Sequence, residues 1–440
     1  MISFRYPLFK KPILNRFFKQ CLATGILLFV GCTSHAEESV AISPSAPPLQ
    51  WSEAITRTLS KNPSLIAFGF QLSAQEARVQ QAGIKTNPEI SLSVEDAFGT
   101  GNFSGMDQAE TSLGISWVLN GRQRQQRIAT AQARTSVLEV EQDIHRLDAA
   151  ATTARLYINV LALQARLQQT QQSIDLSSDA VKVINSRVNA GNSPAAEVAR
   201  AKVDLSRRLL EHEDIEHELD IARHQLAAHW GDTDTVFSEV RGDIFNLPAP
   251  SNYSDLRARF QDNPRLAHFV TTERLEESHI ALAKAESKPQ WKVSAGLKHI
   301  AATHDQALTA GVSVPLALFD QQQGRIAEAR ANMELSRAER EAERVRLDAA
   351  VFGLHQELLH NLHLIKAYRK DILPQLEVAM KETRRAYDLG RYGYVEWQTV
   401  QRELLDAKNS LIDASVAAHI QAIEIERLTG VAVTPHAQIN

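Results

Sequence analysis

An internal duplication is the strongest constraint that this sequence places on its fold. Lys61-Asn62-Pro63-Ser64-Leu65 returns as Asp262-Asn263-Pro264-Arg265-Leu266, at an offset of 201 residues. Ala190-Gly191 returns as Leu389-Gly390 at an offset of 199 residues. The two units should therefore have the same order of secondary-structure elements and similar apolar faces to bury.

The repeats divide the chain into segments. The first predicted repeat spans residues 50–231 and the second spans residues 252–430. The Pro-containing stretch Leu247-Pro248-Ala249-Pro250 predicts a linker at 232–251. Residues 431–440 form a C-terminal tail.

Each repeat reads as a helix, two strands, a very long helix, a turn and another helix. Apolar and polar residues alternate in four segments, which predicts strands at about 89–97, 109–118, 290–300 and 307–315. Almost nothing interrupts a helix from Gly121 to Gly191 or from Gln321 to Gly390, although Pro374 predicts a local bend. Each of these spans would be about 100 Å long at 1.5 Å per residue.

The first long span carries the apolar seam of a coiled coil. Apolar residues recur at alternating spacings of three and four, namely Val137, Val140, Ile144, Leu147, Ala151, Ala154, Ile158 and Leu161. Only 19 Gly and 15 Pro occur in 440 residues, which favours long helices. The two Cys lie within the first 32 residues, which excludes a disulfide scaffold and a Cys-built metal site.

The N-terminus has the features of an export signal over residues 1–36. It contains five basic side chains and no acid, followed by an apolar stretch from Cys21 to Val30 that is too short to span a bilayer. Two processing sites compete. Ser34-His35-Ala36 is a small-x-Ala cleavage site, whereas Phe29-Val30-Gly31-Cys32 resembles a lipobox that would lipidate Cys32.

The mature chain is acidic. Without the first 36 residues, 43 Lys and Arg face 52 Asp and Glu, a net charge of −9. This balance disfavours nucleic acid and anionic membrane surfaces as partners and suits the handling of cations. The aromatic content of 6% also argues against a protein that stacks on bases.

The strands predict a membrane barrel shared between copies. Each hairpin has an apolar and a polar face, yet the flanking helices offer no layer to cover the apolar face. Lipid is the remaining partner in an exported chain, and a sheet in lipid must close because an open edge leaves backbone groups unpaired. Four strands cannot close, since the smallest barrels have about eight. The pattern therefore predicts a homo-oligomeric barrel continued by a helical cylinder, a conduit rather than an enzyme.

The duplicated plan resembles the TolC-like outer-membrane efflux factors over nearly all of residues 50–430. The shared markers are the two Asn-Pro helix starts, the turn Tyr387-Asp388-Leu389-Gly390 and the closing Leu428-Thr429-Gly430. The resemblance implies a mainly α fold with a small β part. It implies a homotrimer whose twelve strands form one barrel, continued by a long α-helical barrel.

A narrower resemblance points to the cobalt–zinc–cadmium branch of that family. It lies in Asn87-Pro88-Glu89 and in the Gly-rich stretch from Gly99 to Glu110. Members of this branch usually carry a Gly-Gly-Lys-Arg-like segment before the long helix, where this chain has Asn120-Gly121-Arg122. The resemblance implies docking to a periplasmic adaptor and an inner-membrane proton-driven RND pump, in a protein set in outer-membrane lipid and reaching into the periplasm.

The second inter-helix turn holds the candidate gate residues. In the family this turn forms the constricting ring, so its position implies Tyr387, Asp388 and Arg391 as gate residues that link neighbouring helices. Glu396 falls at a family position that carries an acidic ring, and a carboxylate ring in a narrow pore favours cations. The plainer alternative is that all four are ordinary exposed helix-end residues, with Asp388 acting as a cap.

No catalytic, cofactor or metal site is predicted. Histidines are frequent on two predicted helices, but the i,i+4 pairs typical of zinc sites are missing, which favours solvated surface histidines. The chain lacks Gly-x-Ser-x-Gly, His-Glu-x-x-His and phosphate-binding loop motifs.

Two alternative functions stay open on the sequence. The same fold could serve as a duct for drug efflux or for type I secretion of polypeptides. A different class is a periplasmic coiled-coil scaffold or adhesin, which would have no strands facing the membrane.

Overall fold

The computed structural model describes residues 47–235 and 237–431. The predicted export signal, Cys32 and the tail beyond residue 431 lie outside the described residues. All elements named below belong to one unit, Ala46–Asn440.

The first repeat contains two short helices, a β-hairpin and two long helices. In chain order these are α1 (Trp51–Lys61), α2 (Pro63–Ala82), β1 (Glu89–Glu95), the 3₁₀ turn η1 (Gly101–Phe103), β2 (Glu110–Leu119), α3 (Gly121–Asn189) and α4 (Ala195–His229).

The second repeat has the same order. It contains α5 (Tyr253–Ala258), the 3₁₀ turn η2 (Arg259–Asp262), α6 (Pro264–Glu286), β3 (Trp291–Ile300), β4 (Asp305–Ser313), α7 (Gln323–Ala367), the π-helical turn η3 (Tyr368–Ile372), α8 (Leu373–Asp388) and α9 (Tyr394–Thr429).

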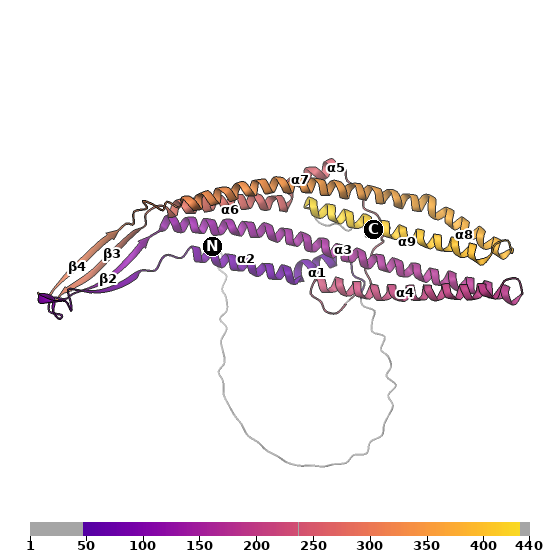
Figure 1. Ribbon diagram of the computed structural model, residues 1–440, viewed down its shortest axis with the longest axis horizontal. Coiled ribbons are helices and arrows are strands. Elements are labelled where there is room, and N and C mark those ends of the chain that lie inside the picture. The colour runs from indigo at the N-terminus through magenta and orange to yellow at the C-terminus, as the bar shows by residue number, and fades with distance from the viewer. Residues whose placement is uncertain (1–46, 236, 432–440) are drawn as a thin grey trace, which may run out of the picture. The chain divides into compact units, whose positions relative to one another are not determined.

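The long helices run side by side, with the sheet at one end and the α3–α4 and α8–α9 turns at the other (Figure 1). Next to the sheet, the order of packed helices is α2, α3, α6, α7. Toward the turns the order becomes α4, α3, α9, α8. Each repeat therefore contributes half of one continuous layer, and α2, α4, α7 and α8 are its outermost helices.

Equivalent asparagines start the second helix of both repeats. The Asn62 side chain accepts hydrogen bonds from the backbone of Ser64 and Leu65, and it donates to the His229 carbonyl at 2.7 Å. Asn263 likewise caps α6 and donates to the Leu428 carbonyl. Because each cap binds the end of the last helix of its repeat, one residue type fixes both a helix start and a tertiary contact.

The linker is part of the core. Phe237, Val240 and Ile244 are buried, and Val240 forms a parallel bridge with Leu49. The Gln164 side chain binds Val240 twice, since its amide donates to the Val240 carbonyl and its oxygen accepts from the Val240 N–H. The linker therefore crosses the helices at a fixed place.

The second long helix is continuous but irregular. Its π-helical turn η3 lies just before Pro374, which occupies the first turn of α8 and has no N–H for an intrahelical bond. Arg369 on this turn donates to the Phe245 carbonyl at 3.1 Å and lies over the Phe245 ring. The irregular turn thus holds the linker.

Candidate functional site

The sheet has one apolar face. The strand order is β1-β2-β3-β4, all neighbours being antiparallel, so β1 and β4 are the edges within one chain. The register aligns Leu92, Leu113, Leu297 and Leu308 in one row across all four strands. Their exposed fractions are 70%, 52%, 54% and 87%, so no other part of the described chain covers this face.

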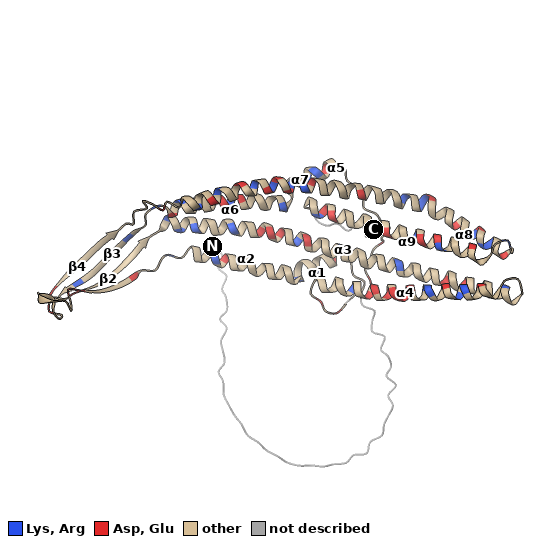
Figure 2. Cartoon of the chain, viewed as in Figure 1, with Lys and Arg blue, Asp and Glu red and all other residues tan. Residues whose placement is uncertain are grey.

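The opposite face of the sheet is polar and partly charged. Lys298 pairs with Glu110, and Lys292 pairs with Glu89. Both lysines stand on β3, and each carboxylate comes from the first repeat, so both ion pairs link the two hairpins. Figure 2 shows that charged residues are sparse on the strands compared with the helices.

The two inter-helix turns have the same geometry. Gly191 and Gly390 both have φ +72°, a conformation that suits glycine. Asn192 N donates to the Arg187 carbonyl and Arg391 N donates to the Ala386 carbonyl, the bond that closes a Schellman motif after a helix. The duplicated glycine therefore ends α3 and α8 in the same way.

Tyr387 joins the two hairpin tips. It is 1% exposed, and its hydroxyl donates to Glu197 Oε2 of α4 at 3.0 Å. Its ring packs 5.3 Å from the Trp397 ring and lies under the Arg187 guanidinium at 4.8 Å. Arg187 of α3 also donates to the Asp388 carbonyl at 2.7 Å. Side chains of the first repeat thus bind the end of α8 at two points.

Burial raises the pKa of the Tyr387 hydroxyl. The Ser193 hydroxyl opposes this shift, and the hydrogen bond to Glu197 adds to it. Tyr387 therefore stays protonated, and able to donate, throughout the physiological pH range.

The other predicted gate residues lie around Tyr387 but on the surface. Asp388, Arg391 and Glu396 are all exposed, and Asp388 takes part through its backbone carbonyl. Glu396 lies close to Gly393, where an added Cβ would meet its Oε2 at 3.1 Å and Glu197 Oε1 at 3.8 Å. The two repeat-equivalent glutamates therefore converge on one turn.

Sequence reasoning missed Arg187 and Glu197 as partners of the gate residues. The signal for Glu197 was present, since it stands 199 residues before Glu396. The role of Arg187 had no such signal, because its repeat counterpart at the same offset is Ala386.

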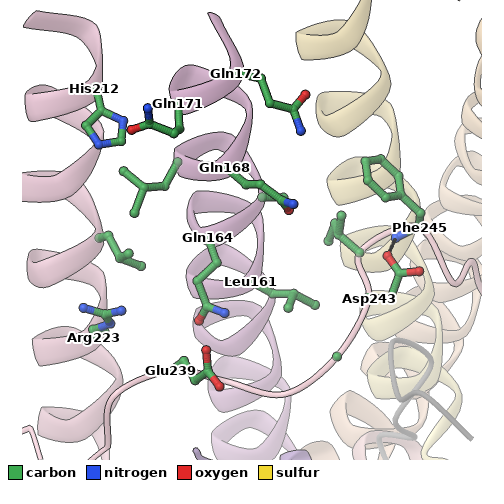
Figure 3. Close-up of a pocket in the computed structure, with 15 residues that line it drawn as sticks. Leu161, Gln164, Gln168, Gln171, Gln172, His212, Arg223, Glu239, Asp243 and Phe245 are labelled. Carbon is green, nitrogen blue, oxygen red and sulfur yellow. Dashed lines mark hydrogen bonds between the residues drawn. The ribbon is translucent and has the colours of Figure 1, made fainter. Parts of the chain in front are cut away.

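A groove of about 850 Å³ lies where the linker crosses α3 and α4 (Figure 3). Gln164, Gln168, Gln171 and Gln172 of α3 lie along it. His212 of α4 stands on its wall and is bound to Thr170 at 2.8 Å. Because Gln164 holds the linker and His212 binds a core hydroxyl, part of this wall is structural.

The histidines make ordinary contacts. His229 and His355 contact the backbone carbonyls of Ala149 and Ser251. Among residues 47–235 and 237–431, no group of three or more His, Cys, Asp or Glu is arranged to hold a metal ion. In the same residues, no helix is both long and apolar enough to cross a membrane.

Comparisons with known proteins identify this architecture. The sequence profile described as outer membrane efflux protein matches residues 54–232 and 258–431, which is most of the chain in two segments. A relative named cobalt-zinc-cadmium resistance protein CzcC, from Cupriavidus metallidurans, is 23% identical over 386 residues. That match covers 88% of this chain and 91% of the relative.

Solved structures share the fold. The outer membrane protein VceC of Vibrio cholerae matches with a TM-score of 0.71 and 16% identity, covering 87% of this chain and 97% of that one. A structure of CusC, a protein described as forming a transmembrane channel, matches with a TM-score of 0.70 and 16% identity. It covers 89% of this chain and 96% of that one.

Proposed function

Because the chain belongs to the outer membrane efflux protein family, we propose that it is the exit duct of a tripartite RND-type system that exports divalent heavy-metal cations. Its family consists of passive outer-membrane channels, so it is not an enzyme. The metal substrate is supported by the name of the relative that matches 88% of this chain. The acidic balance of the mature chain is compatible with cationic cargo.

The main observation in support of a duct is the uncovered apolar face of the four-stranded sheet. A row of leucines more than half exposed would be costly in water and favourable in lipid. The unpaired edges of β1 and β4 need partners in a membrane, because backbone groups in hydrocarbon must be satisfied. Three copies would supply twelve strands and close the barrel, which makes the protein a homotrimer.

The partners follow from the duct. An outer-membrane channel has no energy source of its own, so an inner-membrane proton-driven pump must load it. A periplasmic adaptor must bridge the gap between the two membranes. The end of the helices that carries the α3–α4 and α8–α9 turns lies farthest from the sheet, which favours this end as the docking side.

The gate belongs to the same end. We propose that Tyr387, Asp388 and Arg391 hold the second hairpin in place and that Glu396 contributes to a cation-favouring ring. What supports the first part is the pair of bonds from Tyr387 to Glu197 and from Arg187 to the Asp388 carbonyl. What supports the second part is the exposure of Glu396 beside the turn.

Tolerance measurements test the substrate. A strain that lacks this gene, and has no redundant duct, should lose tolerance to zinc, cobalt or cadmium and keep its tolerance to a panel of drugs. Unchanged metal tolerance with increased drug sensitivity would instead indicate a drug duct.

Membrane fractionation tests the location of the sheet. The chain should stay in the outer membrane after carbonate washing, because its strands would be embedded in lipid. Release by the wash would support a periplasmic scaffold.

A further inference from the structure

The outermost helices of the layer carry apolar side chains without a partner in the described chain. On one flank, Phe70 of α2 is 71% exposed, and Leu210 and Ile221 of α4 are 61% and 58% exposed. On the other flank, Val345 of α7 and Val378 of α8 are 56% and 58% exposed. Single exposed apolar residues are common, but here they follow both outer edges of one layer.

The internal duplication predicts which helices should cover these flanks. In one chain, α3 of the first repeat packs against α6 and α9 of the second. The counterpart of α3 is α7–α8, and the counterparts of α6 and α9 are α2 and α4. Within the described part of one chain, α7–α8 has no helices of another repeat beside it, and α2 and α4 have no long helix of another repeat beside them. A second copy placed head to tail would cover both flanks, because its α2 and α4 would pack against α7–α8 of the first copy.

The contact between α3 and α9 within one chain also predicts which parts of the two flanks would lie side by side. Arg166 of α3 pairs with Asp413 of α9. The counterpart of Asp413 at the 199-residue offset is Asp214 of α4, and the same offset takes Arg166 to Ile365 of α7. The middle of α4 in one copy would therefore lie beside the end of α7 in the next.

These two segments carry opposite charges. Glu211 to Asp220 of α4 contains six acidic residues and no Lys or Arg, and Figure 2 shows this acidic stretch on α4. Leu358 to Lys370, which lies between Glu357 and Asp371, contains Lys366, Arg369 and Lys370 and no acidic residue. Arg369 is bound to the linker at Phe245, so Lys366 and Lys370 are the lysines available to a second copy. The side chains of Glu213 and Asp220 are 63% and 75% exposed; within α4, Glu213 lies 3.9 Å from His217 and Asp220 pairs with Arg223 at 3.1 Å.

We propose that the acidic segment of α4, residues 211–220, faces the basic segment 358–370 of a second copy of this chain, and that this contact helps to hold neighbouring copies head to tail around the duct. The inference rests on the proposed homotrimer. Complementary charge disfavours a head-to-head arrangement, because that would bring two acidic or two basic segments together.

Zero-length cross-linking tests the contact in the unmodified protein. A carbodiimide activates a carboxylate, an amine in direct contact attacks it to form an amide, and the carbodiimide leaves as a urea that has taken up the elements of water. In detergent-purified protein, peptides that join Lys366 or Lys370 to the segment 211–220 should appear in the oligomer bands. Because α3 and α9 separate α4 from α7 within one chain, such a product joins two copies.

Charge reversal tests the contact between the two segments independently. Glu213→Lys with Asp220→Lys should lower the temperature at which trimers dissociate, and so should Lys366→Glu with Lys370→Glu. The chain that carries all four changes should recover most of the loss, because the attraction is restored with the signs exchanged.

Lys182→Glu is the control. Lys182 is an exposed residue of α3, which is not one of the outermost helices, so this change should leave the dissociation temperature unchanged. Stable trimers without these cross-links, and without recovery in the four-residue variant, would overturn the proposed contact and leave the trimer standing. A monomeric unmodified protein would remove both the contact and the proposed homotrimer.

Discussion

At the scale of residues, the end of α8 is held by two different kinds of contact. The Tyr387 hydroxyl donates to a carboxylate, and the Arg187 guanidinium donates to the Asp388 carbonyl. Hydrogen bonds to charged groups each contribute about 1.5–3 kcal/mol, less where solvent reaches them. Because both bonds cross from one repeat to the other, they restrain the second hairpin directly.

Tyr387→Phe should raise the conductance of single channels in planar bilayers. The change removes the hydroxyl and keeps the ring, so the packing on Trp397 is preserved while the bond to Glu197 is lost. We expect the contact between the two hairpin tips to be weakened by about 1 kcal/mol, which would let the second hairpin move away more readily. Tyr392→Phe, at a tyrosine that is 52% exposed, is the matched control and should change nothing.

The pKa of Tyr387 predicts how this contact depends on pH. Because burial raises the pKa in the folded protein, the stability that the protonated hydroxyl contributes is fully present below a pH of about 10, where an unfolded tyrosine ionises. It is lost as the pH rises further. The conductance ratio of Tyr387→Phe to the unchanged protein should therefore stay constant from pH 6 to about 9. A ratio that falls within that range would contradict this assignment.

At the scale of elements, the sheet is the part of the chain whose environment matters most. Successive residues of each strand face opposite sides, and the register places the apolar residues around Leu113 beside one another across all four strands. The polar face contains Gly114 and Gly296, where an added Cβ on Gly296 would meet the Leu113 carbonyl at 2.7 Å. The two faces of the sheet are therefore not interchangeable.

Leu113→Arg should prevent assembly into the outer membrane. Leu113 lies on a central strand between Leu92 and Leu297, and an arginine on the lipid face costs about 2–4 kcal/mol in the middle of the bilayer. The loss can be measured as the fraction of chain in the outer membrane after fractionation. Ser112→Arg, one residue away on the polar face, should be tolerated much better. Equal losses for the two variants would argue against a lipid-facing side.

At the scale of the whole described molecule, ion pairs join the two repeats midway along the helices. Asp148 of α3 accepts hydrogen bonds from Arg265 at the start of α6 and from Arg427 near the end of α9. Arg155 of α3 pairs with Glu424 of α9. These residues are partly buried and share partners, which makes them a network rather than isolated surface pairs.

Asp148→Asn should lower the free energy of unfolding by about 1 kcal/mol, because two arginines lose their shared carboxylate while solvent still screens part of the site. Denaturant unfolding in detergent measures this change. Asp179→Asn is the control, since Asp179 forms an exposed pair with Lys182 within α3 and should cost only a few tenths of that amount.

The elements and their order could be predicted from the sequence. The alternation of apolar and polar residues, the scarcity of Gly and Pro, and the duplicated Asn-Pro and Gly signals are local properties. Local properties decide where a helix starts, where it ends and which side of a strand is apolar. The family followed from the same duplicated signals, and the profile match confirms it.

Which side chains meet could be learned only from the fold. Glu197 and Tyr387 stand 190 residues apart, so no local pattern could pair them, and the contact depends on how two hairpins pack. The linker is a second case: its prolines predict a segment between the repeats, and the structure adds that Phe237, Val240 and Ile244 are buried in the core. Such contacts arise from the summed packing of long helices, which no short segment of sequence encodes.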